Sequence, residues 1–132
     1  MIQEVRNPLL LPDILKLAEF VPDTPIAALE KMLINGMSSK DAKIIIHKKY
    51  DTVTSFIYAS IEEFRGQDSI FIQSCYITPE NDNIGHEFLA RMRTWAKERG
   101  IKNLIMITRR SHEGFERKYH FKPVSTIMQR EV

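Results

Sequence analysis

The chain has 132 residues, 43% of them hydrophobic and 27% charged, with a net charge of +2. These values predict one globular domain over residues 1–132 and exclude disordered, fibrous and collagen-like proteins. The single cysteine, Cys75, has no partner for an internal disulfide, and no run of about 20 apolar residues is present to span a bilayer. With no signal-peptide pattern at the start, we expect a cytoplasmic protein with no membrane partner.

Hydrophobic periodicity predicts a short strand and then two helices in the first part of the chain. The strand covers residues 2–5, and apolar positions in residues 14–21 predict the first helix. The second helix is marked by Thr24 as N-cap, by Pro25 at the first helical position, and by Gly36 beyond its end.

Three strands are predicted next, as an antiparallel meander. Residues 44–47 and 53–64 alternate around a turn at Tyr50-Asp51, which is typical of a hairpin. A second turn at residues 65–68 leads into a strand over residues 69–78.

From Ile84 the period becomes helical, and this helix ends near Gly100. Residues 104–108 are uniformly apolar, as in a parallel strand covered on both faces, followed by a short helix over residues 112–119. Residues 121–129 predict a last strand. This order predicts an α+β fold with one mixed, mostly antiparallel central sheet and helices on both faces.

Four segments carry a family resemblance that covers nearly the whole chain. They are Ile77-Thr78-Pro79-Glu80, similar to a strand-ending V-x-P-E; residues 84–89 (IGHEFL), similar to I-G-x-x-L-L; residues 95–102 (WAKERGIK), similar to A-x-x-x-G; and residues 115–124 (FERKYHFKPV), similar to F-Y-E-K-L-G-F-K-P-V. In this order they resemble the GNAT family of acyl-CoA-dependent N-acetyltransferases. The resemblance implies acetyl-CoA as co-substrate and an amine acceptor, which the sequence does not identify.

The resemblance also implies how acetyl-CoA is held. The pantetheine arm would enter a wedge between the fourth and fifth strands, and amides at the start of the next helix would bind the pyrophosphate. The residues that this implies for cofactor binding are Cys75, Tyr76 and Ile77 at the strand edge, Asn81, Asn83, Ile84, Gly85 and His86 at the phosphates, and Arg109 at phosphate or adenine. A solvated loop arginine is the alternative for Arg109.

The phosphate loop departs from the family pattern. Residues 79–85 read P-E-N-D-N-I-G, two residues shorter than the family's P-E-Y-R-G-K-G-I-G and without two of its glycines and its basic residues. Asp82 adds a negative charge that would cost about 1–4 kcal/mol at ~4 Å from a phosphate. Asn81 and Asn83 can adopt the left-handed conformation, which keeps an anion-binding turn open.

Acyl transfer needs a base for the amine proton and an acid for the departing thiolate. In the family, a tyrosine at the position of Glu116 commonly protonates the leaving thiolate. Glu116 can act as this acid only if burial keeps its carboxyl group protonated. The alternative is an exposed helix residue without a catalytic role. Tyr119 is the second candidate acid or a core residue. Glu62 is a candidate base, or an exposed edge carboxylate. The four histidines lack metal-ligand spacing, so no metal is predicted.

An alternative function is a GNAT-like binding or regulatory module that has lost the chemistry. Residues 86–122 carry 10 basic and 4 acidic groups, against 8 and 12 in residues 1–85. This charge suits a nucleic acid or another anionic partner, although solvated helix faces give the same count and no aromatic residues are evidently interleaved. The family resemblance also implies a homodimer through the C-terminal strands.

Overall fold

The structure is a computed structural model that describes residues 1–21, 24–79, 83–107, 112–125 and 128–131. In this part of the chain one sheet has the strand order β1 (Ile2–Glu4), β2 (Ala42–Lys49), β3 (Thr52–Phe64), β4 (Gln67–Tyr76) and β5 (Leu104–Met106). Neighbouring strands are antiparallel except for the parallel pair β4 and β5.

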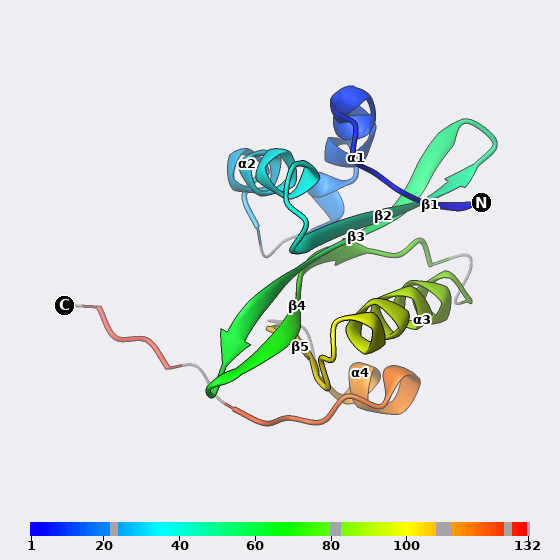
Figure 1. Cartoon of the computed structure of the whole chain (residues 1–132). Helices are drawn as coiled ribbons and strands as arrows, with labels where there is room; N and C mark the ends of the chain where they lie inside the picture. Colours follow the sequence, from blue (N-terminus) through cyan, green and yellow to red (C-terminus); the bar gives the residue numbers. More distant parts are fainter. Residues whose placement is uncertain (22–23, 80–82, 108–111, 126–127, 132) are drawn as a thin grey trace.

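Helices cover both faces of the sheet, which confirms the predicted α+β class (Figure 1). On one side lie α1 (Leu11–Leu15), α2 (Ile26–Met37) and two short 3-10 helices, η1 (Pro8–Leu10) and η2 (Ala18–Phe20). On the other lie α3 (Asn83–Glu98) and α4 (His112–Tyr119). We call these the α1/α2 face and the α3/α4 face. None of the helices within the described residues has the length and apolarity needed to cross a membrane.

The two faces bury separate hydrophobic clusters because side chains alternate along the strands. On β3, Phe56 and Tyr58 point to the α1/α2 face, and Ile57 and Ala59 to the α3/α4 face. On α3, the buried residues recur at three- and four-residue spacing, as a helix lying on a sheet requires; they are Ile84, Phe88, Met92, Trp95 and Ala96. Burial of each large apolar side chain stabilises the fold by about 1.5–3 kcal/mol.

A bulge interrupts β4 at Gln73. Tyr58 of β3 pairs with Ser74, and the next residue, Ala59, pairs with Ile72, so no residue of β3 lies opposite Gln73 in the strand register. A bulge bends its strand and increases the local twist. Beyond this point β4 is therefore redirected.

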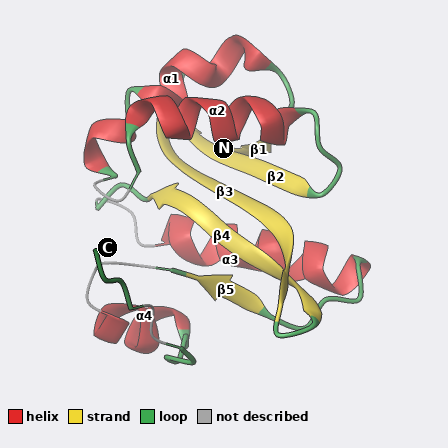
Figure 2. Cartoon of the chain, turned by 90° about the vertical axis from the view of Figure 1, so that its left-hand side faces the viewer, coloured by secondary structure: helices red, strands yellow, loops and turns green. Residues whose placement is uncertain are grey.

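β5 follows β4 only up to the bulge. The parallel pairing joins Ile70, Phe71 and Ile72 of β4 to residues 104–106, and it ends there in the described residues. The two strands point apart at their carboxyl ends (Figure 2). Within the described residues, the ladder between β4 and β5 thus stops before residues 73–76 of β4. We call the space beside these residues the wedge.

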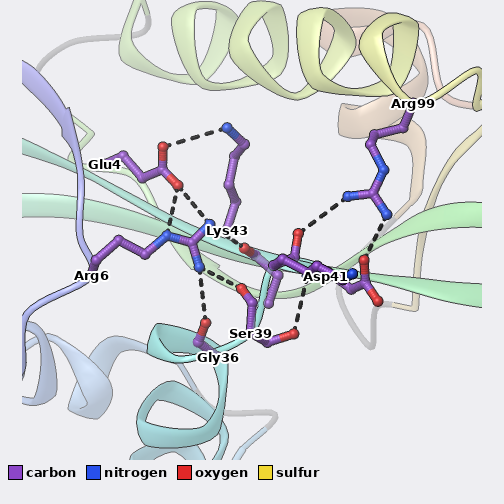
Figure 3. A network of polar contacts seen from close by, with 9 residues as sticks. Glu4, Arg6, Gly36, Ser39, Asp41, Lys43 and Arg99 are labelled. Carbon is purple, nitrogen blue, oxygen red and sulfur yellow. Dashed lines mark hydrogen bonds and ion pairs between the residues drawn. The ribbon is translucent and has the colours of Figure 1, made fainter.

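The opposite end of the sheet is held by Arg6, which follows β1. Its guanidinium donates to the carbonyl oxygens of Gly36 (3.4 Å), Ser39 (2.5 Å) and Ala42 (3.0 Å) and pairs with Glu4 at 2.8 Å (Figure 3). Two of these carbonyls belong to the end of α2 and the residues just after it, where helix carbonyls lack partners and carry partial negative charge. Arg6 therefore ties β1 to the connection between α2 and β2.

Arg99, just beyond α3, reaches the same connection from the other face. It donates to the carbonyl oxygen of Lys40 at 3.2 Å and pairs with Asp41 at 2.6 Å. We call Glu4, Arg6, Asp41 and Arg99 the clamp. Through it, both helical layers are joined to one short loop.

The two N-terminal helices differ from their predicted forms. The first helix ends at Leu15 and continues as the 3-10 turn η2, rather than running through residues 14–21. The N-cap of α2 is Pro25 and not Thr24, and no side chain caps it. Gly36 lies inside the last turn of α2 instead of beyond its end. A glycine fits there because the ring of Tyr58 packs where a Cβ would be.

The last predicted strand is wrong for the described residues of 121–129. Pro123 has no N–H to give to a ladder, and the backbone of this segment is bound elsewhere, since Arg65 donates to the carbonyl oxygen of Val124 at 2.9 Å. The described residues that follow are exposed and extend away from the body of the protein (Figure 1). β5 is also only partly buried, not covered on both faces.

Candidate functional site

A small cleft lies on the α3/α4 face directly under the wedge. Its lining includes Cys75 and Ile77 from the end of β4, Gly85 from α3, and Phe115 and Tyr119 from α4. The remaining lining side chains are aliphatic or aromatic, and the cavity measures about 30 Å³. The cleft is thus a narrow apolar slot between two helices and the end of β4.

The bulge decides which side chains line this cleft. Ile72 faces the α3/α4 side before the bulge, and Cys75 faces it after the bulge. In a regular strand, period-two alternation would instead have placed Ser74 on this side. The bulge therefore keeps the cleft apolar and turns Ser74 to the α1/α2 face, opposite Tyr58.

The first turn of α3 is packed against α4. A Cβ at Gly85 would overlap the Tyr119 hydroxyl and come within 3.1 Å of the Ile77 side chain. The rings of His86 and Tyr119 lie 5.0 Å apart. The absence of a Cβ at Gly85 therefore lets Tyr119 lie directly against the first turn of α3. The cleft that remains has room for about one water molecule.

The other residues predicted for cofactor binding present mainly their backbone. The side chain of Ile84 is buried in the core, and Asn83 is the exposed first residue of α3. The ring of Tyr76 stacks on Phe20 at 5.0 Å and so points to the α1/α2 face. Amides in the first turn of a helix can bind anions, which is the physical basis of the phosphate site predicted at residues 83–86.

Two predicted residues, Asn81 and Arg109, lie outside the described part of the chain, as does Asp82. The structure therefore places the beginning of α3 but not the loop that leads to it. Among the described residues, no three His, Cys, Asp or Glu side chains are grouped closely enough to hold a metal ion.

A chain of polar side chains on the α1/α2 face runs from the bulge residue along β3, away from the wedge. Gln73 donates from Nε2 to the Ser60 hydroxyl at 3.0 Å, and that hydroxyl donates to Glu62 Oε1 at 3.2 Å. Burial raises the pKa of Tyr58 above its usual range, and the Glu62 carboxylate adds to the rise. We call Gln73, Ser60 and Glu62 the polar chain.

The structure therefore divides the predicted catalytic residues. Tyr119 reaches the cleft together with Cys75, while Glu62 lies on the opposite face of the sheet. Glu116 is half-buried on α4 and is not among the residues that line the cleft.

The sequence reasoning missed Gln73 and Ser60. One signal for the bulge was present: the apolar residues of β4 keep a spacing of two from Ile70 to Ile72 and then slip by one to Cys75. Nothing in the sequence indicated that Ser60 would join the two polar side chains.

No family model matches the sequence, and no curated protein matches it either. Solved structures do match in fold over essentially the full chain. The aminoglycoside 6'-N-acetyltransferase AAC(6')-IG from Acinetobacter haemolyticus superposes with a TM-score of 0.82 at 15% identity, covering 100% of this chain and 97% of that one. AAC(6')-Iy in complex with CoA gives 0.80 at 15% identity, with 99% and 93% covered.

A predicted acetyltransferase from Clostridium acetobutylicum, solved with acetyl-CoA, gives a TM-score of 0.75 at 14% identity, with 99% of this chain and 96% of that chain covered. These likenesses confirm the GNAT fold that the sequence segments indicate. They establish the architecture; the chemistry of this chain rests on its own residues.

Proposed function

We propose that this chain, which has the fold of the GNAT N-acetyltransferases, transfers an acetyl group from acetyl-CoA to a primary amine. The observation that carries the proposal is the end of the described β4–β5 pairing at Ile72, where the bulge at Gln73 redirects β4 and β5 diverges from it, so that a wedge opens beside this edge of β4. An extended pantetheine arm carries amides that can add to such an edge as another strand would. The similar structures solved with CoA and acetyl-CoA support this choice of ligand.

The residues around the wedge fit a pantetheine arm. The arm would follow β4 at residues 75–77, and the apolar cleft suits its methylene groups. The amides of residues 83–86 begin α3 beneath it, where the helix dipole favours phosphate. The contact between Gly85 and Tyr119 means that α4 moves outward when the arm enters.

The proposed reaction needs two proton transfers. An ammonium acceptor loses one proton to Glu62 before its nitrogen lone pair forms the new C–N bond. The C–S bond breaks with its electron pair on sulfur, and the second proton, which leaves the nitrogen, is passed to the sulfur to give the thiol. Because Glu62 on β3 and the cleft lie on opposite faces of the sheet, the amine and the thioester would approach from opposite faces.

Tyr119 is the better candidate than Glu116 for the proton that reaches sulfur. Its side chain lines the cleft together with Cys75, next to the edge that the arm would follow. Tyr119→Phe should therefore lower kcat by about 10- to 100-fold, while Glu116→Gln should keep it within about twofold. A larger loss in Glu116→Gln than in Tyr119→Phe would reverse the assignment.

Calorimetric titration with acetyl-CoA, followed by a thiol-release assay with kanamycin A, tests the proposed function. Kanamycin A is a polyamine of the kind named in the similar aminoglycoside acetyltransferases. We expect saturable one-to-one binding of acetyl-CoA and amine-dependent release of CoA. No heat of binding at millimolar acetyl-CoA would refute the enzyme proposal.

The closed cleft favours a second candidate, a GNAT-fold binding module without the chemistry. The contact between Gly85 and Tyr119 blocks the place where the arm would lie. Arg91, Arg93 and Lys97 are exposed on α3 and would supply an anionic partner with positive charge. Salt-dependent binding of duplex DNA, with no binding of acetyl-CoA, would support this candidate.

A further inference from the structure

We infer that α4 is a gate over the wedge and that the free protein holds this gate closed with Tyr119, so that acyl-CoA binds only after α4 swings away from α3. The inference rests on the proposed function for its ligand. It goes beyond that function because it assigns α4 an inhibitory role and gives Tyr119 two positions. It stands on the contact at Gly85, on the size of the cleft and on the way in which α4 is attached.

The first observation is how tightly Tyr119 closes the cleft. A Cβ at Gly85 would overlap the Tyr119 hydroxyl and come within 2.9 Å of the ring carbon Cζ that carries it. The same ring lies 5.0 Å from the ring of His86 in the first turn of α3. The tip of Tyr119 thus lies against the backbone of this turn, where the arm of a ligand bound at residues 83–86 would pass.

The second observation is the size of the space that remains. The cleft measures about 30 Å³, whereas pockets that hold small molecules and cofactors measure about 300–1,000 Å³. Its walls are apolar side chains from the sheet, from α3 and from α4. Since protein interiors are close-packed and resist compression, a pantetheine arm fits only when one wall moves.

The third observation identifies α4 as the wall that moves. Six residues of α3 are buried, and they anchor that helix on the sheet. In α4, by contrast, none of the described side chains is buried: Phe115, Glu116 and Tyr119 are half-buried, and the others are exposed. A segment with little buried apolar surface opens at a low cost in free energy, so α4 leaves α3 more readily than α3 leaves the sheet.

The residues that follow α4 supply a pivot. His120 has a φ of 60°, in the left-handed region that few residues other than glycine adopt. Just beyond it, Phe121 packs against the core of the α3/α4 face, and the carbonyl oxygen of Val124 accepts a hydrogen bond from Arg65 at 2.9 Å. The chain is therefore fixed to the body directly after the helix, so that α4 turns about residues 120–121.

A closed gate lowers the apparent affinity for acyl-CoA. A ligand that binds only the open state has its affinity reduced by the fraction of molecules in that state, and minor states are populated at about 0.1–10%. Removing the contact that closes the gate should therefore tighten binding by at least about tenfold. Because Tyr119 is also the candidate acid of the proposed reaction, Tyr119→Ala should lower kcat while it tightens binding.

The rate at which iodoacetamide alkylates Cys75 reports the gate without any ligand. Cys75 is the single cysteine of the chain, is 9% exposed and lines the cleft together with Tyr119. We expect Gly85→Ala, whose new Cβ overlaps the Tyr119 hydroxyl, to react at least about tenfold faster than the wild type. This variant removes no atom that covers Cys75, so a faster reaction means that α4 has moved. An unchanged rate would overturn the inference.

Two glycine variants are the matched controls. Gly114→Ala places a Cβ on α4 where nothing lies within 4 Å, and it should react at the wild-type rate. Gly36→Ala overlaps the ring of Tyr58 on the other face of the sheet and controls for general destabilisation. It should also leave the alkylation rate unchanged. A rate in Gly36→Ala as high as in Gly85→Ala would show that Cys75 reacts through unfolding of the whole domain, and would overturn the inference.

A double variant tests whether Gly85→Ala acts through Tyr119. In Tyr119→Ala, the nearest atom left for the new Cβ to meet is in the side chain of Ile77, at 3.1 Å. Adding Gly85→Ala to Tyr119→Ala should therefore change the alkylation rate by less than about twofold. The same acceleration in both backgrounds would overturn the role of Tyr119 in closing the gate.

Calorimetry with acetyl-CoA separates failure of the gate from failure of the proposed function. We expect Tyr119→Ala to bind acetyl-CoA at least about tenfold more tightly than the wild type does. If Gly85→Ala accelerates alkylation but neither the wild type nor Tyr119→Ala binds acetyl-CoA, the gate stands and the proposed function is refuted. If acetyl-CoA binds but Tyr119→Ala binds it no more tightly, the proposed function stands and the inhibitory role of α4 is refuted.

Discussion

The two ends of the sheet are built in opposite ways. At the clamp, Arg6 and Arg99 bring β1, α2, β2 and α3 onto one loop with hydrogen bonds and ion pairs to side chains and carbonyl oxygens. At the wedge, the described pairing of β4 with β5 ends at a bulge, and the two strands diverge. We therefore expect local stability to be higher at the clamp than at the wedge.

Two glycines show the same contrast, since each lies under a tyrosine. At the clamp, a Cβ on Gly36 would overlap the ring of Tyr58, which is 7% exposed. At the wedge, a Cβ on Gly85 would overlap only the hydroxyl at the tip of Tyr119, which is half-buried. The first contact belongs to a fixed core and the second to a helix that can separate.

The largest expected effect on stability comes from removing the clamp. Arg6→Ala should lower the free energy of unfolding by about 2–3 kcal/mol, because carbonyl oxygens at the end of α2 lose a charged donor. Arg99→Ala, whose ion pair is more exposed to solvent, should cost only about 0.5–1 kcal/mol. Urea denaturation measures both. Equal losses would contradict the central role of Arg6.

A smaller difference is expected between the two glycines. Gly36→Ala should destabilise the fold by about 1–2 kcal/mol, since overlap with a buried ring outweighs the gain in helix propensity. Gly85→Ala should change stability by less than about 1 kcal/mol, because Tyr119 can swing away. Gly114→Ala is the matched control, as nothing lies within 4 Å of its Cβ position. The measurement is the melting temperature of the three variants. A lower melting temperature for Gly85→Ala than for Gly36→Ala would contradict the expected difference between the two glycines.

The smallest expected effect concerns His47, on β2, which belongs to neither the clamp nor the wedge. Burial lowers its pKa below 6.5, the N-terminal amine lowers it further, and Glu87 acts in the opposite direction. As the pH falls, His47 is therefore protonated at a higher pH in the unfolded chain than in the folded protein. Neutral His47 contributes its full stabilisation above pH 6.5, and this stabilisation declines as the pH falls below that value.

The measurement is the melting temperature between pH 7.5 and pH 5, compared with that of His47→Gln. The variant should lose less stability on acidification than the wild type. Identical pH dependence would show that His47 does not contribute. Acetyl-CoA affinity at pH 7.5 should be the same in both proteins, because His47 does not line the cleft.

The sequence predicted the elements better than it predicted the site. Alternation in residues 53–64 and the helical period from Ile84 each reflect burial on a single face, which local pattern can reveal. The end of α2 was misplaced because the position of Gly36 depends on Tyr58, a residue distant in sequence. The prediction of a last strand over residues 121–129 was wrong because a strand needs a neighbouring strand to pair with. In the described structure, the carbonyl oxygen of Val124 accepts a hydrogen bond from Arg65 instead.

The site was less predictable for the same physical reason. Motif resemblance brought Cys75, Ile77, Gly85 and Tyr119 to attention, and the fold gathers these four around one cleft. The polar chain depends on a bulge and on cross-strand register, neither of which is a property of one segment. The slip in apolar spacing from Ile72 to Cys75 was the one local sign of it.

The most direct test of the account is a backbone amide NMR titration with acetyl-CoA. We predict that shifted signals cluster at residues 73–77 and 83–89 and on α4, with almost no change at Arg6 or in residues 36–43. Such a result would show that the ligand enters the wedge while the clamp stays in place. Shifts centred on the clamp, or confined to the exposed basic residues of α3, would contradict it.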